Sequence, residues 1–178
     1  MKVAMVLIMS FMLLSCGTDD YETGVRAEHI QDNAVRTYLQ NFKALLGYGE
    51  IDVTIEMTED FSRMHNSTNE TVLAICIHDE SKIEINKESW EELDLRSREI
   101  LVFHELGHCF GKIYKHDDSL RRNGIPASIM FPSLLPAGWY AKYKELYIQD
   151  LSFKVAFSRS NPGGATLRAP DVCAYGSH

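Results

Sequence analysis

The sequence has little of several features that would point to particular classes of protein. Lysine and arginine form no stripe along any stretch, and the formal net charge is −7. A surface that binds nucleic acid or anionic lipid normally needs such a basic patch, so we expect no nucleic-acid partner. Internal repeats and linkers are also lacking, and 178 residues suit one domain that buries its own core.

Long hydrophobic runs are lacking too, except for one short run at the N-terminus. This run, Val3–Leu14, follows Lys2 and is too short to span a bilayer. Its length is typical of the apolar core of a signal peptide, which we place at residues 1–15. From the run alone, a plain secretory signal and a signal for lipid attachment are both open.

The end of this run resembles the lipobox of bacterial lipoproteins. It reads Leu-Leu-Ser-Cys-Gly over residues 13–17, and in such proteins the cysteine becomes the lipidated first residue of the mature chain. The resemblance implies lipidation of Cys16, a lipidated flexible tether over residues 16–26 and one domain over residues 27–178. It implies a protein that is exported and lipid-anchored to the bacterial cell envelope, and we expect this protein to be a monomer. Gly17 favours the outer membrane over the inner membrane.

Cysteine is scarce, with four in the chain. If Cys16 carries lipid, then Cys76, Cys109 and Cys173 remain, and they allow at most one internal disulfide. The sequence leaves open which two residues pair.

Hydrophobic periodicity predicts an α+β fold. Apolar residues at helical spacing indicate an amphipathic helix over Ala27–Leu46. Alternation indicates a strand over Ile51–Met57, and the continuous apolar run Thr71–Ile77 suits a more central strand. Lys82–Ile85 alternates again and could form an edge. Aromatic and apolar residues over Trp139–Tyr147 predict a last helix of roughly three to four turns.

The segment Ile100–Phe110 has helical length and apolar residues on all sides, so we expect a buried helix. Its strongly polar side chains are His104, Glu105 and His108. Burying three ionisable groups without a partner would cost several kcal/mol. Residues four apart share one helix face, so the two imidazoles can converge on one zinc ion, with Glu105 beside it.

This motif resembles the metzincin zinc-peptidase motif, H-E-x-x-H-x-x-G-x-x-H. Residues 104–111 read HELGHCFG and match its first eight positions, and we expect Gly111 to end the helix in the left-handed conformation. Residues 128–130, Ser-Ile-Met, resemble the Met-turn of that clan, which places a methionine, here Met130, under the metal. The resemblance implies Zn²⁺ on His104 and His108, with Glu105 as the general base.

The sequence departs from the family motif at the third metal ligand. The motif expects histidine three residues after Gly111, where this chain has Tyr114, and His116 follows two residues later. Residues two apart on an extended segment point the same way, so we favour His116 as the third zinc ligand. Asp117, Asp118 and Tyr114 stay open as alternatives, since some metzincin-like peptidases use aspartate there.

The remaining candidates are better explained without a role in the site. His29, His65 and His78 are expected at the surface. Cys109 points away from the metal, so we expect a core residue or a disulfide partner. The tyrosines at positions 140, 143 and 147 lie at helical spacing, so we expect them in the core.

Together these features predict a zinc-dependent endopeptidase with a metzincin-like fold. A small twisted mixed β-sheet would pack on the N-terminal helix and the buried active-site helix, followed by the Met-turn and a C-terminal helix. The partner would be a peptide or protein substrate, paired in extended form with an edge strand at Thr71–Ile77 or Lys82–Ile85. Two alternatives remain: an inactive zinc-binding lipoprotein or binding module that keeps the fold, and a structural lipoprotein with a chance motif.

Overall fold

The computed structural model describes residues 32–59, 71–161 and 172–175. Its elements, in chain order, are α1 (Asn33–Leu46), β1 (Thr54–Thr58), β2 (Thr71–Ile77), the 3-10 helix η3 (His78–Glu80), β3 (Lys82–Asn86), α2 (Lys87–Glu92), α3 (Leu95–Cys109), α4 (Ala137–Ser160) and β4 (Val172–Tyr175). The predicted α+β class is confirmed. The predicted signal peptide, Cys16 and the tether lie outside the described residues, as do His29 and His65.

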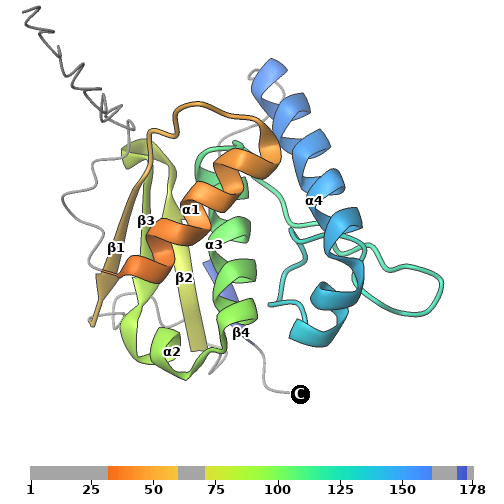
Figure 1. The fold of residues 1–178 in the computed structure, drawn as a ribbon, viewed down its shortest axis with the longest axis horizontal. Coiled ribbons are helices and arrows are strands. Elements are labelled where there is room, and N and C mark those ends of the chain that lie inside the picture. Colours follow the sequence, from red (N-terminus) through yellow and green to blue (C-terminus); the bar gives the residue numbers. More distant parts are fainter. Residues whose placement is uncertain (1–31, 60–70, 162–171, 176–178) are drawn as a thin grey trace, which may run out of the picture.

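The strands form one mixed sheet in the order β1-β3-β2-β4 (Figure 1). β3 runs parallel to β1 and antiparallel to β2, and β2 also pairs antiparallel with β4. The predicted central place of β2 is therefore confirmed, but the prediction of β3 as an edge is wrong. Alternation of apolar residues shows which face is buried and does not show how many neighbours a strand has. Because β2 and β3 are each paired on both sides, neither offers a substrate the edge that we expected.

Helix α3 is the central helix of the fold (Figure 1). It contacts β2 and β3 of the sheet as well as α1 and α4. Its residues from Glu99 to Cys109 are all buried, as the apolar pattern predicts. The helix begins at Leu95, earlier than predicted, because the Asp94 carboxylate caps it by accepting hydrogen bonds from the backbone N–H groups of Arg96 (2.8 Å) and Ser97 (3.0 Å).

Helix α1 ends at Leu46, as predicted, but it begins at Asn33, and residues 27–31 of the predicted helix lie outside the described residues. Asp32 caps α1 by accepting a hydrogen bond from Ala34 N at 2.6 Å, and Gly47 ends the helix with a φ of 74°. Helix α4 has 24 residues, longer than predicted, and its backbone is non-helical at Tyr143. Within the described ranges, no helix combines the length and the apolar character needed to cross a membrane.

A disulfide joins the sheet to the central helix. Cys76 on β2 bonds to Cys109 on α3, with their Cα atoms 5.5 Å apart. This pairing resolves the choice that the sequence left open among Cys76, Cys109 and Cys173. Since Cys109 directly follows His108, the bond fixes the end of α3 that carries the histidines.

We predict that replacing Cys76 and Cys109 together by alanine lowers the free energy of unfolding. The bond spans 33 residues, and a loop of that length is worth about 3–4 kcal/mol through the entropy of the unfolded chain. Urea denaturation measures the loss. Cys173→Ser is the matched control and should leave both stability and the disulfide unchanged. A native disulfide-linked peptide that contains Cys173 would contradict this pairing.

Candidate metal centre

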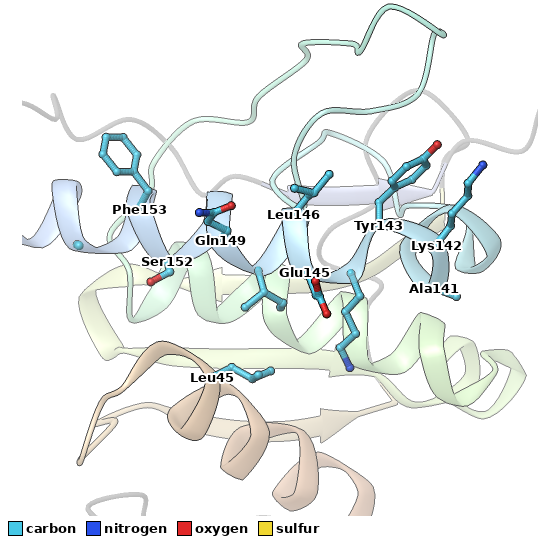
Figure 2. Close-up of a pocket in the computed structure, with 12 residues that line it drawn as sticks. Leu45, Ala141, Lys142, Tyr143, Glu145, Leu146, Gln149, Ser152 and Phe153 are labelled. Atoms are coloured by element: carbon cyan, nitrogen blue, oxygen red, sulfur yellow. The ribbon is translucent and has the colours of Figure 1, made fainter.

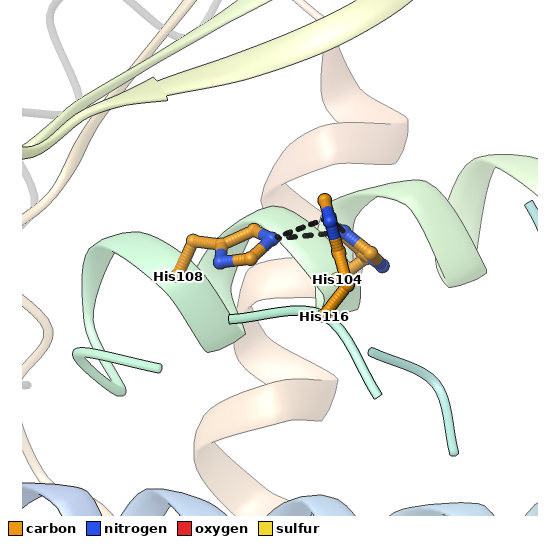
Figure 3. A group of neighbouring side chains, drawn as sticks. All are labelled: His104, His108 and His116. Carbon is orange, nitrogen blue, oxygen red and sulfur yellow. Dashed lines mark hydrogen bonds between the residues drawn. The ribbon is translucent and has the colours of Figure 1, made fainter. Parts of the chain in front are cut away.

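Three histidine rings converge beside α3 (Figure 3). His104 and His108 lie one turn apart on the helix, and His116 reaches them from the segment that follows it. The Nε2 atoms of His104 and His108 are 3.0 Å apart, and Nε2 of His116 lies 3.2 Å from each. The structure therefore brings together the three residues favoured by the sequence.

The opposite ring nitrogens of the two helix histidines are held by backbone carbonyls. Nδ1 of His104 lies 2.8 Å from the oxygen of Ile129, and Nδ1 of His108 lies 2.5 Å from that of Ile113. A carbonyl oxygen can only accept, so each Nδ1 carries the hydrogen and donates it. In a neutral imidazole this arrangement leaves Nε2 without a hydrogen, as a lone-pair donor for a metal.

Both helix histidines are held in the neutral form that binds metal. Burial lowers the pKa of His104 to about 3, and the neighbouring His116 adds to the effect. The pKa of His108 is also lowered well below its ordinary value, chiefly by burial and then by His104. These rings therefore need no proton release at neutral pH before they can coordinate a cation.

The spacing of the three Nε2 atoms fits a tetrahedral zinc ion. Zinc–imidazole bonds of about 2.0–2.1 Å at tetrahedral angles would separate the nitrogens by about 3.3–3.4 Å. The separations of 3.0–3.2 Å are close to that value. Lone pairs that face one another at this distance repel, and a shared cation turns this repulsion into attraction. Three imidazoles also match the ligand number of catalytic zinc sites.

The turn after α3 differs from the predicted one. We expected a left-handed Gly111, but the left-handed residue is Lys112, with a φ of 56°. Gly111 is needed for space, because a Cβ there would lie 2.8 Å from Val155 Cγ2 and would meet the carbonyl oxygen of Gly107. That oxygen accepts a hydrogen bond from Ile113 N at 3.1 Å, which returns the chain toward His108.

The other candidates for the third ligand have other neighbours or are exposed. The ring of Tyr114 lies 4.8 Å from that of His78, and Asp118 is exposed. Burial opposes ionisation of Asp117, but hydrogen bonds from Lys154 and Ser119 outweigh it and lower its pKa to about 2. The path of the chain differs from the extended segment that we expected. It turns at Lys112 and bends at Lys115, so His116 reaches the cluster by a different route.

The segment resembling a Met-turn lies directly against the histidine helix. Met130 is fully buried, and its Sδ packs where a Cβ on Gly107 would be. Gly107 lies between His104 and His108 in the chain, so the methionine contacts the helix at the level of the two ligand candidates. The preceding residue, Ile129, supplies the carbonyl that holds His104.

Glu105 and His78 also lie near the histidine cluster. Glu105 is fully buried on α3, next to His104. His78 was expected at the surface, and this expectation is wrong: the residue is partly buried, and its ring centroid lies 6.4 Å from that of His108. The sequence carried no signal for this approach, because His78 and His108 meet only through the packing of β2 on α3.

A groove of about 1130 Å³ lies on a different part of the molecule (Figure 2). It runs between α4 and the end of α1, where Leu45, Leu146 and Phe153 contribute apolar side chains. None of the three histidines lines it. The groove is therefore separate from the candidate metal centre.

Comparison with known proteins supports the same type of site. Residues 53–131 match a protein-family model described as "Putative phage metallopeptidase". Neither a curated protein nor a solved structure matches the chain significantly. The matched region contains His104, His108 and His116, so the family model and the histidine cluster both fit a zinc metallopeptidase.

Proposed function

We propose that this protein is a zinc-dependent endopeptidase similar to the metzincins, with His104, His108 and His116 as metal ligands. The convergence of three Nε2 atoms within 3.2 Å of one another is the observation that carries the proposal. Carbonyls that hold the opposite nitrogens of two rings add support, because they orient the lone pairs toward one point. The buried Met130 against α3 supports the likeness to metzincins.

The reaction would combine a Lewis acid with a general base. Zinc held by His104, His108 and His116 would supply the Lewis acid, which would lower the pKa of a water molecule toward about 7 and polarise the scissile carbonyl. Glu105 accepts the proton from the attacking water and then delivers it to the leaving amine. Its burial beside His104 suits this role, because a carboxylate shielded from bulk water keeps a defined position. The cleaved bond would be the amide of a peptide or protein substrate.

The two alternatives can be weighed against the same residues. A binding module that has lost turnover would have no use for a carboxylate at Glu105, yet the chain keeps one there. A structural lipoprotein with a chance motif would not need His116, which lies outside the helix and 8 and 12 residues after His108 and His104, to approach both of them at 3.2 Å. The enzyme therefore explains more of the site than either alternative.

We predict that His116→Ala weakens zinc binding by more than about 100-fold, a larger loss than supporting residues usually cause, and abolishes hydrolysis. Competition with a chromophoric chelator measures the zinc affinity. Tyr114→Phe and Asp118→Ala are the matched controls, and both should keep one zinc per chain. Wild-type affinity in His116→Ala would show that another residue is the third ligand.

We predict that Glu105→Gln keeps the zinc and the fold but lowers the rate of peptide hydrolysis by about 10²–10⁴-fold. The amide has nearly the shape of the carboxylate and cannot accept the proton from water. A quenched-fluorescence peptide library measures turnover, and zinc content is determined on the same samples. Near-normal turnover by the zinc-loaded variant would rule out Glu105 as the base.

We further propose that Cys16 is lipidated and anchors the protein in the bacterial cell envelope, more readily in the outer membrane than in the inner membrane. The disulfide between Cys76 and Cys109 supports export, because such bonds persist in oxidising compartments. Metabolic labelling with an alkyne palmitate analogue should mark the wild type and spare Cys16→Ser. Label retained in the variant would contradict lipidation at this cysteine.

A further inference from the structure

Lys154 on α4 contacts two segments beside the histidine cluster, one at Asp117 and the other at Ser128. Nζ of Lys154 lies 2.7 Å from Oδ2 of Asp117 and 3.1 Å from Oγ of Ser128. Both carboxylate oxygens of Asp150, one turn earlier on the helix, lie 2.6 Å from the same nitrogen. Asp117 follows His116 directly, and Ser128 begins the segment that contains Met130.

The low exposure of these four side chains distinguishes their network from an ion pair on the surface. The side chains of Lys154, Asp117 and Asp150 are 24%, 26% and 30% exposed, and Ser128 is fully buried. Ser128 Oγ also donates a hydrogen bond to Asp150 Oδ2 at 2.6 Å. Charges that are largely withdrawn from water and bonded to several partners hold their geometry better than exposed pairs do.

Each of the three residues 128–130 links this network to the cluster. Ser128 Oγ accepts a hydrogen bond from Met130 N at 3.1 Å. The carbonyl of Ile129 holds the ring of His104, and the carbonyl of Met130 accepts a hydrogen bond from Asp117 N at 2.7 Å. Asp117 is therefore held through its side chain by Lys154 on α4 and through its backbone N–H by the carbonyl of Met130.

We infer that Lys154, together with Asp117, positions His116 for metal binding. His116 is the one member of the cluster that does not lie on α3, so its placement depends on the irregular segment after Lys112. The Lys154–Asp117 contact ties that segment to a long helix immediately after the ligand. This inference rests on the proposed zinc site and adds two positioning residues to it, neither of which touches the metal.

The test measures the zinc affinity of Lys154→Met in the full mature chain, by competition with a chromophoric chelator at pH 7. We expect a 10–100-fold loss, the range that supporting residues of metal sites usually show. Lys144→Met is the matched control, because Lys144 is on the same helix and bonds both oxygens of Glu99 on α3, at 3.0 and 2.7 Å. It should bind zinc within about twofold of the wild type.

A second variant separates positioning from loss of stability. Asp117→Asn removes the charge while keeping the size of the side chain and an oxygen for Ser119 N, and Lys154 keeps its bonds to Asp150. It should also lose about 10–100-fold in zinc affinity, and the double variant should be no weaker than the weaker single variant. Cobalt-substituted Asp117→Asn should show an altered visible absorption spectrum, because His116 is displaced, whereas Lys144→Met should match the wild type.

The outcomes distinguish this inference from the proposal on which it rests. A wild type without stoichiometric zinc would remove the proposed site itself. If the wild type binds zinc and Asp117→Asn binds it equally well, the positioning role is wrong while the site stands. If Asp117→Asn loses zinc while a folded Lys154→Met binds as tightly as the wild type or more tightly, Asp117 is a ligand and the inference is overturned.

Discussion

The candidate site depends on two hydrogen bonds between imidazoles and the backbone. The carbonyls of Ile129 and Ile113 each accept the Nδ1 hydrogen of a buried histidine on α3. They select the tautomer whose Nε2 lone pair faces the neighbouring rings, and burial keeps the rings neutral. These two carbonyl acceptors also explain two irregular parts of the fold, because each acceptor lies in a segment that must return to α3.

The surrounding structure keeps those two segments against the helix. Gly111 has no room for a side chain, and Lys112 takes the left-handed turn that brings Ile113 back to His108. Met130 packs on Gly107 and places Ile129 beside His104. The disulfide from Cys109 to β2 fixes the same end of the helix to the sheet. A metal centre benefits from such a frame, because ligands that are already in place lose little entropy on binding.

Patterns within short segments of the sequence predicted the strands, the buried helix and the placement of its two histidines. Alternation found β1 and β3, a continuous apolar run found β2, and an apolar segment of helical length found the buried part of α3, because these patterns follow the burial of each face. The four-residue spacing of His104 and His108 was sufficient to place both on one face. Cys76 and Cys109 could be named as candidates for a disulfide, but their pairing depends on how β2 packs against α3.

The remaining features depend on contacts between distant segments, so the sequence did not contain a local signal for them. The place of β3 inside the sheet follows from its pairing with β1, which no pattern within either strand encodes. Residue His116 was predicted from an extended path, whereas the chain reaches the cluster through a turn and a bend. Lys154 on α4, which holds Asp117, is 37 residues further along the chain. In the sequence it looks like any lysine on the solvent-exposed face of a helix.

The central claim is that three histidines form one zinc centre, and X-ray absorption spectroscopy at the zinc edge tests it most directly. The zinc-loaded mature protein should contain one zinc per chain. Its first shell should consist of nitrogen and oxygen at about 2.0–2.1 Å, with outer-shell scattering from three imidazoles. A shell with sulfur at about 2.3 Å, scattering from fewer than three imidazoles, or a protein that takes up no zinc would contradict the account.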